Sequence, residues 1–149
     1  MKERLYYLTY TSKMIQEMSE DELKKLVETS QVKNARSGIT GLLISLNNTF
    51  IQYLEGEKEN IEALYDTIKN DSRHKNIEIQ FEGVLESRMF SKWNMSLETA
   101  TQSTIERLPK AYSSQYKNML ESVDGSGSNF GLRLIIYFYE LKYKLYQAQ

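Results

Sequence analysis

The chain of 149 residues contains no cysteine, only one histidine and only one proline. Without cysteine there can be no disulfide, no thiolate nucleophile and no Cys-ligated metal, and a single histidine argues against a metal centre. No apolar run reaches membrane-spanning length, and the N-terminal stretch MKERLYYLTY lacks a signal-peptide pattern. We therefore expect a cytoplasmic protein without metal, disulfide or membrane span.

Neither sign of charge dominates, because 19 basic residues face 20 acidic ones for a net charge of −1. This balance gives no electrostatic reason to expect nucleic acid or an anionic membrane surface as a partner. The chain is long enough to bury a sizeable core, and its length favours one globular domain.

Apolar residues alternate in five segments, as in strands, and recur at helical spacing in two. The capping box Ser19-x-x-Glu22 opens the first helix, and Asn47-Asn48 is typical of a hairpin turn. We expect Gly56 to break the third strand. The expected elements are a strand at 5–11, a helix from 19 to 33–34, strands at 42–46 and 49–55, a helix that follows Gly56 and ends at 70–71, a strand at 77–85, and a short strand within 87–98.

This order, βαββαβ with one further strand, predicts a ferredoxin-like α+β sandwich in which two helices cover one face of the sheet. The fold alone does not predict an activity, because it carries many functions. The sequence changes character after Glu98, so we expect a domain at 1–98 and a helical extension at 99–149.

The extension should contain helix within 101–123, a flexible linker at 123–129 and a last helix at 130–146. The last helix has apolar residues on two faces and therefore needs two neighbours. One neighbour can be the same chain, and we expect the other to be a second copy. The sequence thus predicts a homo-oligomer, at least a dimer, that associates through residues 130–146.

One polar residue interrupts an apolar face. In the expected strand FIQYLEGE (50–57), Phe50, Gln52 and Leu54 share the inward face, since side chains alternate along a strand. A buried amide needs hydrogen-bond partners at both its oxygen and its nitrogen. Taken singly, Gln52, Tyr10 and Asn34 are each typical of ordinary structural roles.

Taken together, five motifs are more specific. They are Tyr10 near the end of the first strand, SGITGLL (37–43), FIQYLEGE (50–57), DSRH (71–74) and MFSKWNM (89–95). In this order they resemble the BLUF family, the blue-light sensors that use flavin, over residues 4–98. The resemblance implies the ferredoxin-like fold and a flavin held without a covalent bond: FAD first, with FMN and riboflavin as alternatives.

The resemblance also implies a role for individual residues. Tyr10 and Gln52 would form the photoswitch, with Gln52 bonded to Tyr10 on one side and to the flavin on the other. Trp93 and Met95 would relay the signal on the fifth strand. The expected flavin-binding residues are Tyr10, Leu26, Ser30, Lys33, Asn34, Gln52, Ile68, Arg73 and His74.

Within that set, Leu26 and Ile68 would sandwich the ring and Asn34 would pair with its polar edge. Arg73 and His74 would lie near the ribityl-phosphate side, and Ser30 near the switch. The sequence departs from the family at Lys33, where an uncharged polar residue or His is common.

The implied mechanism is photochemical. Tyr10 would supply an electron and a proton transiently, and Gln52 would be left rearranged by rotation or by tautomerisation. The signal would pass through the fifth strand and the C-terminal helices to a separate downstream protein, so we expect a short photoreceptor without an output enzyme.

Two other classes remain, and a third is disfavoured. A flavin-free ferredoxin-like interaction module is the main alternative, although the Tyr10, Asn34 and Gln52 set argues against it. A small enzyme of the acylphosphatase kind would need an anion cradle, which residues 11–18 do not supply. An RNA-binding sheet would need exposed aromatic residues on a basic face, which the charge balance disfavours.

Overall fold

The computed structural model describes residues 5–46, 48–90, 96–100 and 135. The chain divides into two compact units, Met1–Thr99 and Ala100–Gln149, and nearly all of the second lies outside the described residues. The elements in chain order are β1 (Leu5–Met14), α1 (Glu20–Arg36), β2 (Thr40–Leu46), β3 (Thr49–Glu57), α2 (Lys58–Lys69), β4 (His74–Leu85) and β5 (Ser96–Ala100).

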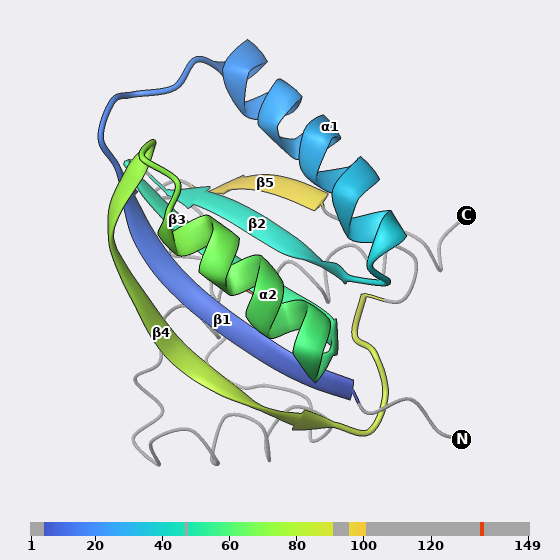
Figure 1. Cartoon of the computed structure of the whole chain (residues 1–149). Helices are drawn as coiled ribbons and strands as arrows, with labels where there is room; N and C mark the ends of the chain where they lie inside the picture. The colour runs from blue at the N-terminus through green and yellow to red at the C-terminus, as the bar shows by residue number, and fades with distance from the viewer. Residues whose placement is uncertain (1–4, 47, 91–95, 101–134, 136–149) are drawn as a thin grey trace. The chain divides into compact units, whose positions relative to one another are not determined.

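The five strands form one sheet in the order β4-β1-β3-β2-β5. β3 pairs antiparallel with both β1 and β2, and β4 pairs antiparallel with β1. Strand β3 therefore lies between the two strands that α1 connects, as the ferredoxin-like prediction requires. Both helices lie on the same face of the sheet (Figure 1), which confirms the expected two-layer α+β architecture.

Helix α1 begins where the sequence predicts and ends later. The Ser19 hydroxyl accepts the Glu22 N–H at 3.2 Å, and the Glu22 carboxylate accepts the Ser19 N–H at 3.4 Å, so the capping box is confirmed. The helix continues to Arg36 instead of ending at 33–34. Asn34 therefore belongs to its last turn, and its carbonyl accepts the N–H of Ile39 at 2.8 Å.

The expectation that Gly56 breaks the third strand is wrong. β3 runs on to Glu57, and Gly56 pairs with Tyr6 of β1. A Cβ at position 56 would lie 3.0 Å from the carbonyl oxygen of Gly38, so the glycine permits a close approach of two backbones.

The core lies between the helices and the sheet, with a second apolar layer on the other sheet face. The first contains Leu8, Tyr10, Val27, Leu54 and Ile61, among others. The second layer is aromatic. The centroid of the Tyr7 ring lies 6.0 Å from that of Tyr53 and 6.2 Å from that of Phe81, and the centroids of the Phe90 and Tyr53 rings are 5.4 Å apart. Burial on both faces explains why β3 is almost entirely buried.

Strand β5 begins at Ser96, so Trp93 and Met95 lie outside the described residues and the relay assigned to them stays a prediction. The expected helices within 101–123 and at 130–146 also lie outside, except for Ile135, which is helical and fully buried. In the described part of the chain, no helix is long and apolar enough to cross a membrane.

Candidate functional site

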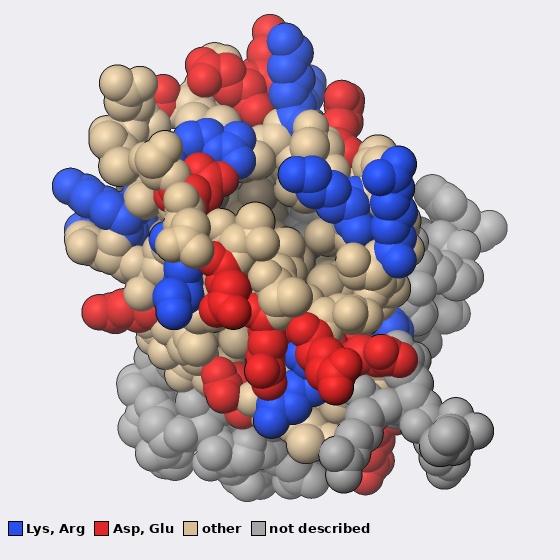
Figure 2. Space-filling model, in the orientation of Figure 1, with Lys and Arg blue, Asp and Glu red and all other residues tan. Residues whose placement is uncertain are grey.

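A cavity of about 160 Å³ opens between the two helices and the sheet. In Figure 2 the surface is hollowed between groups of basic side chains. All nine residues expected to bind a flavin line this cavity: Tyr10, Leu26, Ser30, Lys33, Asn34, Gln52, Ile68, Arg73 and His74. The fold thus brings together residues that are up to 64 positions apart, from Tyr10 to His74.

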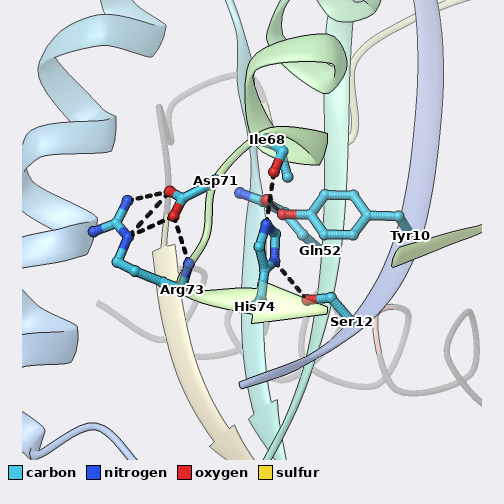
Figure 3. Close-up of polar contacts among 7 residues, drawn as sticks. All are labelled: Tyr10, Ser12, Gln52, Ile68, Asp71, Arg73 and His74. Atoms are coloured by element: carbon cyan, nitrogen blue, oxygen red, sulfur yellow. Dashed lines mark hydrogen bonds and ion pairs between the residues drawn. The ribbon is translucent and has the colours of Figure 1, made fainter. Parts of the chain in front are cut away.

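Tyr10 and Gln52 meet at the base of the cavity. They are direct cross-strand partners on β1 and β3, and the Tyr10 hydroxyl donates a hydrogen bond to Oε1 of Gln52 (Figure 3). Tyr10 is 4% exposed and Gln52 7%. The predicted bond between these side chains is confirmed, and Nε2 of Gln52 points away from the phenol.

The phenol of Tyr10 is held in its neutral form. Burial raises the pKa of Tyr10 well above its usual range, and the negative charge of Asp71 raises it further. The O–H proton therefore stays between the two side chains over the ordinary pH range, where it can serve proton transfer.

Helix α1 contributes one continuous face. Leu26, Ser30, Lys33 and Asn34 follow the i, i+4, i+7, i+8 spacing of a helical stripe and all line the cavity. Asn34 is 3% exposed, whereas Lys33 is exposed. The stripe thus begins with an apolar residue and becomes polar toward the end of the helix, with Asn34 inward and Lys33 outward.

Arg73 and Asp71 form an ion pair on the cavity wall (Figure 3). The Arg73 Nε lies 2.9 and 3.0 Å from the two Asp71 carboxylate oxygens, and Nη2 also contacts Oδ2. These bonds from Arg73 lower the pKa of Asp71 to about 2. The pair gives this edge of the cavity a fixed guanidinium with two donor nitrogens, Nε and Nη2, directed at one carboxylate.

His74 is fixed on both ring nitrogens. Nε2 lies 2.6 Å from the carbonyl oxygen of Ile68, and Nδ1 lies 3.0 Å from the Ser12 hydroxyl. Because a carbonyl only accepts, Nε2 carries a proton. Through its contacts with Ser12 and Ile68, the histidine joins β1 and α2 at the start of β4.

Six further lining residues were missed in the sequence: Met18, Leu43, Phe50, Leu64, Thr67 and Asp71. Phe50 could have been found, because it shares the strand face of Gln52, and Leu64 lies one helical turn before Ile68. Leu43 could not, because its place depends on the register that pairs it with Gln52.

The lining fits a flat, heteroaromatic ligand with a polar edge. Aliphatic side chains from both helices form the walls, with Leu26 on α1 and Ile68 on α2. Two buried amides, Asn34 and Gln52, offer both donors and acceptors, which suits the alternating polar atoms of a flavin ring.

Comparison with known proteins supports a flavin-binding site in this cavity. Residues 5–96 match the family model described as "BLUF: Sensors of blue-light using FAD". The photoactivated adenylate cyclase subunit beta of Euglena gracilis is 34% identical over 103 residues, which cover 68% of this chain and 12% of that protein. This chain therefore spans about an eighth of the length of that curated relative.

Two solved structures cover nearly the whole chain. The dark-state structure of BlrB, a BLUF protein, has a TM-score of 0.72 at 25% identity and covers 93% of this chain and 98% of its own. The photo-activated state of BlsA has a TM-score of 0.68 at 26% identity and covers 91% and 94%. Both share the α+β fold of this chain.

Proposed function

Because the chain belongs to the BLUF family of blue-light sensors, we propose that its cavity binds FAD without a covalent bond and that Tyr10 and Gln52 form the light-driven switch. A BLUF domain senses blue light with a flavin, and residues 5–96 form such a domain. The observation that carries the proposal is the buried hydrogen bond from Tyr10 to Gln52 in the cavity wall.

Each group of lining residues binds a different part of the flavin. Leu26 and Ile68 hold the ring between the helices, and Asn34 binds its polar edge. Arg73 and His74 serve the ribityl-phosphate side, with Lys33 at the rim and Ser30 beside the switch. FAD is the flavin that the family description prints, and FMN and riboflavin are the alternatives that purification distinguishes.

When bound, the flavin supplies the absorption of blue light and an oxidising excited state. Tyr10 gives up an electron, and its O–H proton moves toward Oε1 of Gln52 along the existing hydrogen bond. The electron and a proton then return to Tyr10, which regains its starting form. Gln52 is left rearranged, by rotation or by tautomerisation, and presents a different hydrogen-bonding group to the cavity.

We propose that the signal leaves through β5, with Trp93 and Met95 as relays, toward a downstream protein in the cytoplasm. We assign sensing without substrate turnover to this chain. The cyclase activity in the name of the Euglena relative belongs to a protein of which this chain spans 12%.

One set of absorption spectra tests the proposal. The purified protein should be yellow, release its flavin on acid or heat treatment, and shift its absorption reversibly to the red under blue light. Tyr10→Phe keeps the ring and removes the hydroxyl, so it should bind flavin and lose the red shift. Gln52 then lacks one partner, at a cost of about 1–3 kcal/mol.

The controls separate the alternatives. A protein that stays colourless after reconstitution with FAD, FMN and riboflavin would support the flavin-free interaction module. A normal, reversible shift in Tyr10→Phe would show that another side chain is the donor.

A further inference from the structure

Glu55 is a fully buried carboxylate on the sheet face opposite the cavity. It follows Gln52 by three residues on β3, and an odd separation along a strand places two side chains on opposite faces. Glu55 does not line the cavity, so the proposed photochemistry leaves it without a role. A buried carboxylate is costly unless it is well bonded, so its partners need an explanation.

Four donors satisfy the Glu55 carboxylate. Oε1 accepts the Phe90 N–H at 2.6 Å and the Thr40 hydroxyl at 2.9 Å. Oε2 accepts the Met89 N–H at 2.9 Å and the Tyr53 hydroxyl at 3.1 Å. Burial raises the pKa of Glu55, although the bonds from these donors act against that rise.

These bonds hold one particular segment, residues 88–90, against the sheet. Arg88 adds a bond from Nη1 to the Thr40 hydroxyl at 3.1 Å, and the Phe90 ring lies 5.4 Å from that of Tyr53. The segment follows β4 and leads toward β5, and in Figure 1 it turns back past the start of β2.

Tyr53 lies next to Gln52 on β3, but its side chain is on the face of Glu55. It shares a peptide bond with Gln52, and its hydroxyl and ring contact Glu55 and Phe90 respectively. Hydrogen bonds weaken steeply once distance or angle departs from the optimum. A displacement of the β3 backbone at Gln52 therefore changes the bonds that hold Met89 and Phe90.

We propose that Glu55 is a positioning residue that couples β3 to residues 88–90, so that the rearrangement of Gln52 changes how firmly this segment is held. The inference rests on the proposed photoswitch and adds to it a route across the sheet. Glu55 acts through the N–H groups of Met89 and Phe90, and it touches neither Tyr10 nor the ligand.

Hydrogen exchange of the flavin-loaded full chain, in the dark and under blue light, tests this coupling. In the unmodified protein, light should speed exchange at the Met89 and Phe90 amides roughly tenfold, as expected when a charge-assisted bond is lost. Glu55→Gln removes the charge and replaces one accepting oxygen with an NH₂ group, so one of the two N–H groups loses its acceptor and the other keeps only a neutral one. It should keep the red shift, speed dark exchange at both amides, and abolish the light-minus-dark difference.

Two further variants keep the test decisive. Glu57→Gln removes a charge from the exposed end of the same strand and should behave as the unmodified protein. Tyr53→Phe keeps the ring contact and removes only the hydroxyl bond to Glu55, so it should reduce the light response at Met89 even if Glu55→Gln fails to fold.

The outcomes are distinct. A light-minus-dark difference that persists in Glu55→Gln would overturn the coupling. When Glu55→Gln does not fold, an undiminished difference at Met89 in Tyr53→Phe would overturn it, as would the absence of a difference from an unmodified protein with a normal red shift. A purely structural clamp would alter exchange equally in dark and light. Loss of the red shift in the unmodified protein would refute the proposed function itself and the coupling with it.

Discussion

Gln52 illustrates how much of the switch depends on the chemistry of one side chain. Its Oε1 accepts the Tyr10 proton, and its Nε2 is a donor directed elsewhere. A carboxylate at this position could only accept, and an aliphatic group could do neither. The amide is thus the group that can exchange a donor for an acceptor without a change of charge.

The Asp71–Arg73 pair predicts a measurable pH dependence. The pKa of Asp71 is about 2 in the folded protein against 3.8 for the free side chain, so between these values the unfolded chain binds more protons. Stability from this pair is present above about pH 4 and is lost as pH falls toward about pH 2. Asp71→Asn should therefore flatten the fall in free energy of unfolding between about pH 5 and about pH 3, measured by urea denaturation.

Arg73→Gln is the matched variant, because it removes the same ion pair from the other side. It should give a similarly flattened profile. A profile for Asp71→Asn that stays as steep as that of the unmodified protein would show that the pair contributes nothing to acid stability.

Among the elements, β2 and β3 depend on a glycine for their close approach. A Cβ at Gly41 would lie 2.0 Å from the carbonyl oxygen of Tyr53, a backbone atom that cannot turn away. Gly41→Ala should therefore cost more than about 2 kcal/mol in free energy of unfolding, measured by chemical denaturation. It should also disturb Tyr53 and, through the adjacent peptide, Gln52.

Gly38→Ala is the control for this prediction. Gly38 has a φ of +63°, and a Cβ there would meet nothing within 4 Å. Its cost should be the backbone strain alone, about 1 kcal/mol. Equal losses in the two variants would show that the sheet accommodates a Cβ at Gly41 without the expected clash with Tyr53, since Gly41 has no positive φ.

The elements also show what a sequence can and cannot predict. Local signals sufficed for the order of elements, the capping box and the helical stripe of Leu26, because each depends on near neighbours. The extension of β3 through Gly56 depends on a backbone from elsewhere in the fold.

Contacts between side chains on strands far apart in sequence could not be predicted from periodicity alone. The pairing of Tyr10 with Gln52 and of Leu43 with Gln52 follows from strand register, which one residue of slip would change. The bond between Tyr10 and Gln52 was predicted from the family resemblance, and Asp71 and Glu55 were not predicted at all. The main-chain partners of Glu55, Met89 and Phe90, are brought near only by the fold, whereas Asp71 pairs with Arg73 two residues along the chain.

At the scale of the whole molecule, the two faces of the sheet carry different groups. The sheet carries the proposed switch on one face and the Glu55 bonds on the other, so β3 is the element common to both. The proposed coupling through Glu55 would therefore start from the same central strand as the switch and act on its opposite face.

The pattern of residues 130–146 predicts self-association. One apolar stripe contains Ile135, which is fully buried within the chain. The second stripe, Leu134, Phe138, Leu141 and Leu145, lies on another side of the expected helix and would form a contiguous apolar patch in water. Its burial contributes roughly 25 cal/mol per Å² before association costs, so we propose a homodimer or larger assembly through this stripe.

Replacing both Phe138 and Leu141 with Glu should shift the protein toward monomer in light scattering while flavin binding persists. Lys142→Glu, between the stripes, changes charge without removing apolar area and should leave the assembly intact. A monomer in dark and light at micromolar concentration would contradict the proposal. The second stripe would then have to be covered by this chain itself, and the expected two-sided helix would need no partner.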